Sequence, residues 1–151
     1  VDGVEPAAPV VAPGGLLGVV RSVDRKTSVA IVWSHPDFRV SAMTRGGEVF
    51  GIVAPHGVEG PNELLLELRG VPYREKVPPG TTIYTSGVGG TSGVYPRGIP
   101  IGEVIAVAEE EEGWARTYSV RPAVHPARAS HVIILTGPAL GLGSAFAPEF
   151  R

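Results

Sequence analysis

Proline and glycine are spread along the whole chain, and their spacing limits the length of any helix. The 151 residues include 15 prolines and 21 glycines, so that few windows of ten residues escape both. A helix needs about that length to be stable, and both residue types interrupt it. The chain is therefore expected to consist of short extended segments.

Nine short segments rich in β-branched residues lie between these interruptions. Val29, Ile31 and Trp33 alternate along one of them, as they would in a strand with one buried face. Turn dipeptides such as Gly46-Gly47 separate the segments. The pattern predicts an all-β protein with little or no helix. The expected strands are Leu16–Val23, Ser28–Ser34, Arg39–Thr44, Glu48–Ala54, Leu64–Arg69, Thr81–Ser86, Ile101–Ala108, Thr117–Arg121 and His131–Leu135.

Two similar segments suggest that the strands are divided between two small β-barrels packed together. Residues 18–23 and residues 102–107 both read G-x-V-x-x-V, which is a short internal repeat. We expect residues 16–80 to form mainly a first barrel and residues 81–135 mainly a second, with about six strands each and with terminal strands that can cross over.

The two ends and two internal segments are predicted separately. Residues 1–15 and 136–151 are rich in Pro, Gly and Ala. The first is expected to be a linker or an arriving strand, and the second a flexible tail. The acidic run Glu109–Glu112 is predicted to be a hairpin tip. Val124 to Ser130 is predicted to form one helical turn.

Composition excludes several kinds of chemistry. The net charge is −2 and no basic block is present, which argues against nucleic-acid binding. The chain has no cysteine, so disulfides, thiolate nucleophiles and cysteine metal sites are excluded. His56, His125 and His131 lack the spacing of metal ligands, and no metal or cofactor is expected. No apolar run approaches the ~20 residues of a membrane-spanning helix.

The loop TSGVGGTSGVYPRGIPIG, residues 85–102, is the strongest candidate for a catalytic or phosphate-binding motif. From Gly87 it gives G-x-G-x-x-S, with Ser92 in place of the third glycine of a dinucleotide fingerprint. Neither Ser86 nor Ser92 is centred in the G-x-S-x-G of a nucleophile elbow. We therefore predict a rigid inter-strand connection with Tyr95 packed on a barrel. Its structural turn residues are Gly87, Gly89, Gly90, Pro96, Gly98, Pro100 and Gly102.

A serine hydrolase on a double-barrel fold is the alternative from another functional class. It would combine His35 and Asp37 with Ser86 or Ser92, because such triads are recognised by geometry and not by order. However, His35-Pro36-Asp37 is typical of an exposed turn. An oligonucleotide-binding barrel is a further alternative, but it requires a basic groove interleaved with aromatic residues.

Apolar side chains near turns are the candidates for contact with another protein, because packing demands least there. These partner-binding candidates are Phe38, Tyr73, Val88, Tyr95 and Ile99.

The motifs together resemble those of the rod shape-determining MreC family. The first half carries Thr27-Ser28 before an apolar strand, the turn Pro36–Val40 and Gly51-Ile52. The second half carries T-S-G-x-G-G followed by Y-P-x-G-I-P-I-G, which is the more specific part. One departure is visible, because Thr91–Val94 lengthen the loop between the two motifs.

This resemblance implies two small β-barrels without a catalytic apparatus, and a scaffold of the peptidoglycan elongation machinery. The implied partners are a class B penicillin-binding transpeptidase, the membrane protein MreD and, indirectly, MreB filaments. The resemblance also implies a periplasmic or extracytoplasmic location, with a membrane anchor and coiled coil outside this sequence. Self-association is expected to give a dimer in the full-length protein and to be weak in this segment.

Overall fold

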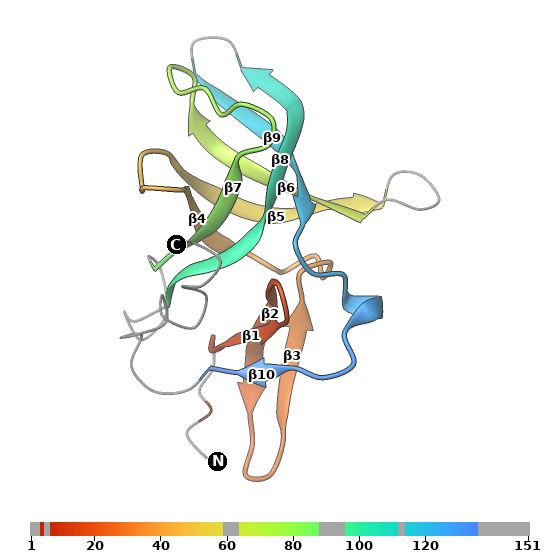
Figure 1. The fold of residues 1–151 in the computed structure, drawn as a ribbon. Coiled ribbons are helices and arrows are strands. Elements are labelled where there is room, and N and C mark those ends of the chain that lie inside the picture. The colour runs from red at the N-terminus through yellow and green to blue at the C-terminus, as the bar shows by residue number, and fades with distance from the viewer. Residues whose placement is uncertain (1–3, 5–6, 59–63, 88–95, 112–113, 136–151) are drawn as a thin grey trace.

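The computed structural model describes residues 4, 7–58, 64–87, 96–111 and 114–135, and this part of the chain is nearly all β (Figure 1). All nine strands expected from the sequence are present, and a tenth precedes them. The strands are β1 (Pro9–Ala12), β2 (Gly15–Val23), β3 (Ser28–Val32), β4 (Val40–Thr44), β5 (Phe50–Val58), β6 (Leu64–Pro72), β7 (Thr82–Ser86), β8 (Arg97–Glu111), β9 (Ala115–Pro122) and β10 (Ile133–Ile134). The predicted helical turn is the short 3₁₀ helix η1 (Pro126–Arg128).

Six strands close into a barrel in the order β4-β5-β6-β9-β8-β7, with β7 pairing back to β4. All neighbouring pairs are antiparallel. Closure leaves this barrel without an unpaired strand edge. β8 and β9 do form a hairpin near the predicted acidic tip, but Glu109, Glu110 and Glu111 still pair with β9, and Glu112 lies outside the described residues.

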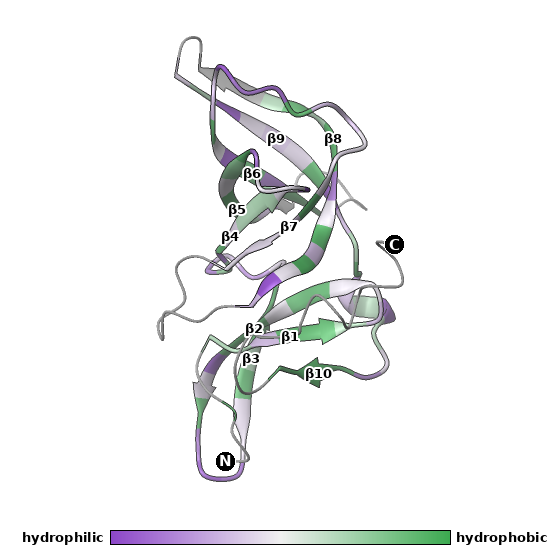
Figure 2. Cartoon of the chain, turned by 60° about the vertical axis from the view of Figure 1, so that its left-hand side comes forward, coloured by the Kyte–Doolittle hydropathy of each residue, from purple (hydrophilic) through white to green (hydrophobic). Residues whose placement is uncertain are grey.

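The other strands form a four-stranded sheet in the order β10-β1-β2-β3, which lies below the barrel in Figure 1. Figure 2 shows that β1 and β10 consist mainly of hydrophobic residues. β1 is buried along its whole length, because β10 and β2 pair with it on either side.

The predicted division of the chain is wrong in two respects. Strands from Val40 to Pro122 all belong to the single closed barrel, so the boundary lies between β3 and β4 and not at residue 80. The second unit is a four-stranded sheet in the described residues, and not a barrel of six strands. Residues 1–15 are not merely a linker, because β1 supplies a buried strand. Its apolar run does not alternate, and Pro9 takes the first strand position, where proline is tolerated.

The G-x-V-x-x-V repeat corresponds to a repeated structural feature. A Cβ on Gly18 would lie 2.0 Å from the carbonyl oxygen of Ile31, and one on Gly102 would lie 2.2 Å from that of Arg121. In both cases the pairing register shifts immediately after the first valine of the motif, Val20 or Val104. The motif therefore encodes close approach of a neighbouring strand followed by a β-bulge.

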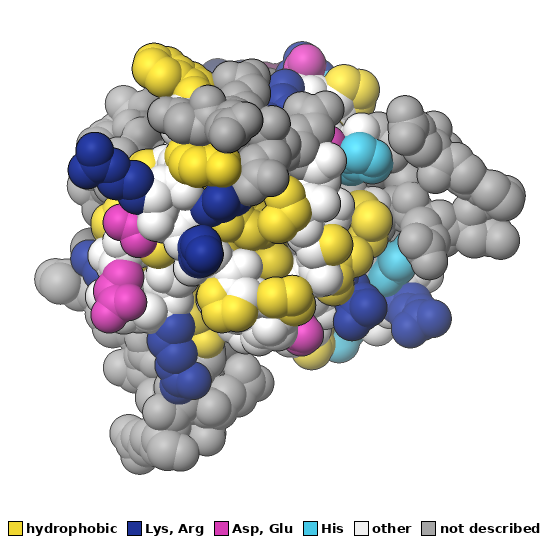
Figure 3. Space-filling view, turned by 90° about the horizontal axis from the view of Figure 1, so that it is seen from above, with side chains coloured by type: hydrophobic (Ala, Val, Ile, Leu, Met, Phe, Trp, Pro, Cys, Tyr) yellow, Lys and Arg dark blue, Asp and Glu magenta, His cyan; other side chains and the backbone are white. Residues whose placement is uncertain are grey.

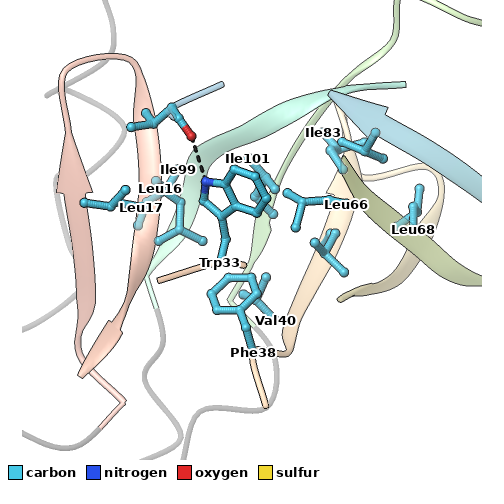
Figure 4. Packing of buried hydrophobic residues seen from close by; sticks show 14 of the residues in the cluster. Leu16, Leu17, Trp33, Phe38, Val40, Leu66, Leu68, Ile83, Ile99 and Ile101 are labelled. Atoms are coloured by element: carbon cyan, nitrogen blue, oxygen red, sulfur yellow. Dashed lines mark hydrogen bonds between the residues drawn. The ribbon is translucent and has the colours of Figure 1, made fainter. Parts of the chain in front are cut away.

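The sheet and the barrel share one hydrophobic core. Figure 4 shows Trp33 between Leu16 and Leu17 of the sheet and Leu66 of the barrel. The indole Nε1 of Trp33 donates a hydrogen bond of 2.7 Å to the carbonyl oxygen of Val124. One side chain therefore joins the end of β3 to the segment that leaves the barrel after β9.

The loop predicted between two strands does connect β7 to β8, which pair antiparallel with Ser86 opposite Arg97. Buried Thr85 joins the two ends of this loop by hydrogen bonds. Its Oγ1 donates to the carbonyl oxygen of Pro96 at 2.8 Å and accepts from the amide of Ile99 at 3.0 Å.

The predicted turn residues of this loop have different outcomes. Gly87 has a φ of 81°, the left-handed geometry expected of a turn glycine. Gly98 has a φ of 92° but is the second residue of β8 and not a turn residue. Pro100 and Gly102 are not turn residues, because β8 begins earlier than expected and both lie inside it. Pro96 is buried immediately before β8. Gly89 and Gly90 lie outside the described residues.

Candidate protein-binding surface

Two large hydrophobic side chains stand on the outside of the barrel. Phe50 and Ile52 are separated by one residue on β5, and 48% and 43% of their surfaces are exposed. Between them and the neighbouring strands lies a groove of about 370 Å³. Ser41 of β4 and Arg69 of β6 lie opposite Ile52 on either side. Exposed apolar surface of this kind favours contact with another protein.

Gly51 lies between Phe50 and Ile52 on β5, and a Cβ there would point to the inner face of the barrel, toward buried Leu68. A Cβ at this position would lie 2.7 Å from the carbonyl oxygen of Arg69 and 2.8 Å from Cδ1 of Leu68. Neither distance leaves room for a side chain, so glycine allows β5 and β6 to approach closely here.

A charged cluster borders the groove on β5 and β6. The Glu67 carboxylate accepts hydrogen bonds from His56 Nδ1 and from Arg69 Nε, the latter at 2.8 Å. The Glu67 side chain is only 13% exposed, and this burial raises its pKa. The hydrogen bonds from His56 and Arg69 outweigh burial and hold the pKa of Glu67 below its ordinary value. The cluster thus places an ionised carboxylate, which already accepts hydrogen bonds from His56 and Arg69, beside an apolar groove.

Figure 3 views the molecule from above. Hydrophobic side chains gather in neighbouring clusters across the middle of this face, and Lys and Arg side chains lie among and around them.

The sequence-based contact residues only partly reach the surface. Phe38 and Ile99 are completely buried, so their prediction as partner-binding residues is wrong. Both lie near turns, but both belong to the shared core. Tyr73 is half-buried, with the Arg116 guanidinium 4.2 Å from its ring centre. Val88 and Tyr95 lie outside the described residues.

The sequence carried a signal for Phe50 and Ile52 that these predictions did not use. The expected strand Glu48–Ala54 is apolar on both faces. An antiparallel strand with one solvated face should instead alternate with polar residues. A continuously apolar strand therefore indicates an outer face that is available for contact with another protein.

His35 and Asp37, two residues of the hydrolase alternative, lie in a turn. The amide of Asp37 donates to His35 Nδ1 at 3.0 Å, and the amide of Phe38 donates to the His35 carbonyl oxygen at 2.9 Å. Arg21 binds the Asp37 carboxylate at 2.8 Å. His35 and Asp37 thus form the turn that their sequence favours. Ser86 is buried at the end of β7, and Ser92 lies outside the described residues.

Two other kinds of site are absent from the described ranges. No three His, Asp or Glu side chains gather there as metal ligands would. No helix in the same ranges is long and apolar enough to cross a bilayer.

Comparisons with known proteins identify close relatives of the whole arrangement. A family model described as "Rod shape-determining protein MreC, barrel core" matches residues 1–136. The cell shape-determining protein MreC of Listeria monocytogenes (serovar 1/2a, strain ATCC BAA-679 / EGD-e) is 34% identical over 137 residues, which are 89% of this chain and 44% of that protein. The chain thus spans less than half the length of this relative.

Solved structures agree with this result. An MreC structure from Listeria monocytogenes superposes with a TM-score of 0.76 at 33% identity, over 89% of this chain and 63% of that one. The MreC in a complex between penicillin-binding protein PBP2 and MreC from Helicobacter pylori superposes with a TM-score of 0.63. Its identity is 18%, over 83% of this chain and 74% of that one, so it supports the fold alone.

Proposed function

The chain belongs to the family of the rod shape-determining protein MreC, and from this we propose that it is a non-enzymatic scaffold of the cell-elongation machinery. We propose further that the outer face of β4, β5 and β6 binds a class B penicillin-binding transpeptidase. The observation that carries this proposal is the pair of exposed side chains Phe50 and Ile52 beside an apolar groove on a closed barrel.

Two features support a role for this face as a binding surface. A closed barrel has no free strand edge, so partners must bind its side chains and not its backbone. Phe50 and Ile52 project from paired strands whose backbone is already hydrogen-bonded. Binding would therefore bury apolar surface that is held in place before the partner arrives, which lowers the entropic cost of association.

The remaining parts of the assembly are proposed from family membership. MreD and, indirectly, MreB would be further partners of the full-length protein. The segment would act on the periplasmic or extracytoplasmic side of the inner membrane, anchored by a part of the protein outside this sequence. Self-association of this segment would be weak.

A binding titration tests the proposed surface. The chain is titrated with the extracytoplasmic part of the cognate class B transpeptidase, and the wild type is compared with Phe50→Ser/Ile52→Ser. We expect the double variant to bind at least about tenfold more weakly, because truncating central interface anchors costs ~1–2 kcal/mol or more.

Val29→Ser is the matched control, because Val29 is similarly exposed but lies on β3 of the other sheet. It should bind as the wild type does. Unchanged affinity of the double variant, with both proteins folded, would exclude the groove as the binding site. Equal weakening by Val29→Ser would show that the effect is not specific to this face.

A further inference from the structure

A second cavity lies where the sheet meets the barrel. It has a volume of about 500 Å³, which is in the range of about 300–1,000 Å³ that is usual for small-ligand sites. Its apolar walls include Ala12 beside the β1–β2 turn, Leu65 of β6 and Ile105 of β8. Most of the other described lining residues belong to the segment from Arg121 to His131, which carries η1 beside the junction (Figure 1).

The charged and titratable side chains among the described lining residues are all basic. They are Arg121, His125, Arg128 and His131. Within the described ranges, Arg121 and Arg128 form no ion pair and their guanidinium groups donate no hydrogen bond. Glu103 lies opposite Arg121 in the β8–β9 ladder and shares a neighbouring cavity with it, but the two side chains are not paired. Each guanidinium group can therefore bind a carboxylate of a ligand through two hydrogen bonds.

The wall that carries these basic residues is held in place by interactions with the sheet. Trp33 Nε1 donates to the carbonyl oxygen of Val124, and the Trp33 ring meets that of His125 edge to face with centres 6.4 Å apart. His125 Nδ1 accepts from the amide of Ala127 at 3.2 Å, so the proton of a neutral ring lies on Nε2, which can donate to a ligand. The cavity is therefore formed before a ligand arrives, which lowers the entropic cost of binding.

The two parts of the lining select one kind of ligand. A small inorganic anion would bind the guanidinium groups but would leave the apolar walls in contact with water. A purely apolar ligand would remove water from charged donors without supplying acceptors, which is unfavourable. A ligand with two carboxylates and an apolar body satisfies both parts. The carboxyl-terminal end of a peptide has this composition when an acidic side chain lies close to the terminal carboxylate.

We propose that this cavity binds the carboxyl-terminal end of a short peptide that contains one acidic residue and apolar side chains. Arg121 and Arg128 each bind one of the two carboxylates, and the apolar side chains of the peptide contact Leu65 and Ile105. The site is separate from the groove on β5, so it does not depend on the transpeptidase contact proposed above.

Isothermal titration calorimetry tests this site with a defined probe. The chain is titrated with the N-acetylated peptide Ala-Glu-Ala-Leu, whose terminal carboxylate is free. We expect saturable binding of one peptide per chain, and added salt should weaken it because both polar contacts join opposite charges. The matched uncharged peptide has glutamine in place of glutamate and an amidated terminus. It should bind about tenfold more weakly or worse, because the charge-assisted hydrogen bonds are lost.

Variants of the chain separate the cavity from general attraction between charges. Arg121→Ala/Arg128→Ala should weaken binding of the peptide by about tenfold or more. Arg25→Ala/Lys26→Ala is the matched control, because it removes two positive charges from exposed positions between β2 and β3. It should bind as the wild type does. Arg121→Lys/Arg128→Lys keeps the charges but loses the two-bond geometry, so its affinity should lie between those of the wild type and the alanine variant.

Three outcomes would overturn the inference: a wild type that does not bind the peptide, folded alanine and lysine variants that bind it as the wild type does, or equal binding of the uncharged peptide. Inorganic phosphate that binds as tightly as the peptide would also overturn it, because the apolar walls would then contribute nothing. The same holds if vesicles of anionic lipid are bound in place of the peptide. None of these outcomes affects the transpeptidase titration, because that titration depends on Phe50 and Ile52 alone.

Discussion

Single residues at the junction of sheet and barrel make contacts that cannot be predicted from the neighbouring sequence. Trp33 belongs to the first unit, yet its hydrogen-bond acceptor is Val124, which is 91 residues away. Its neighbours in the core come from both units (Figure 4). The alternation of Val29, Ile31 and Trp33 predicts that Trp33 is buried, but it cannot indicate the partner, because that depends on how the two units pack.

Replacement of Trp33 tests this junction. Trp33→Phe should lower the free energy of unfolding by about 2–4 kcal/mol, since it removes core volume and leaves the Val124 carbonyl without this donor. Urea denaturation measures the change. Trp114→Phe is the control, and its exposed position predicts a change within about 0.5 kcal/mol. Equal effects of the two variants would contradict the role of Trp33.

Glu67 makes the stability of the fold depend on pH in the acid range. Its pKa in the folded state lies below the ordinary value of 4.5, so the ionised group stabilises the fold above that pH. As the pH falls from about 4.5 through the lower folded pKa, the unfolded chain binds the proton first and this contribution is lost.

Urea denaturation of the wild type and Glu67→Gln between neutral and acid pH measures this effect. The wild type should lose stability more steeply than the variant over that window, and the two curves should converge at the acid end. Parallel pH profiles would show that the Glu67 cluster does not stabilise the fold.

At the scale of elements, glycine decides where strands approach most closely. Gly18 and Gly102 begin the two G-x-V-x-x-V segments, and both face a neighbouring carbonyl oxygen at a distance that excludes a side chain. The repeat predicts a shared local structure, and the structure contains one. It does not predict which strands complete each unit, because strand pairing is set by contacts distant in the sequence.

Substitution of Gly102 measures this close approach. Gly102→Ala should lower the free energy of unfolding by about 3 kcal/mol. Its Cβ would overlap the backbone of Arg121, so β8 or β9 would have to move. Gly70→Ala should cost only about 1 kcal/mol, because space is open there and only its φ of 75° is unfavourable. Melting temperatures compare the two, and a larger loss at Gly70 would show that the distance at Gly102 does not limit the fold.

Strand positions were predictable because β-branched runs and turn residues are local signals. β1 was predicted only as an alternative to a linker, because its four residues do not alternate and prolines surround it. Phe38 and Ile99 were misplaced because proximity to a turn in sequence does not measure depth in the core. The groove was missed because the prediction used the apolar residues on both faces of Glu48–Ala54 only as evidence for a strand and not for an apolar outer face.

At the scale of the whole molecule, the barrel and the sheet share a core but differ in their exposed surfaces. The barrel has an apolar groove beside Phe50 and Ile52, and the junction has a basic cavity. A scaffold needs separate surfaces for different partners. Both of these surfaces include β6, which contributes Arg69 and Gly70 to the groove and Leu65 to the cavity. The account requires the groove to face another protein in the assembled machinery.

Site-specific photo-crosslinking in living cells tests this requirement most directly. A photoreactive phenylalanine analogue is placed at Ser41, which lines the groove opposite Ile52, or at Val29 on β3 as the control, in the full-length protein. We expect the Ser41 position to give an adduct with a class B penicillin-binding transpeptidase and the Val29 position to give none. An adduct from Val29 alone, or none from Ser41 while the cells keep their rod shape, would contradict the proposed binding face.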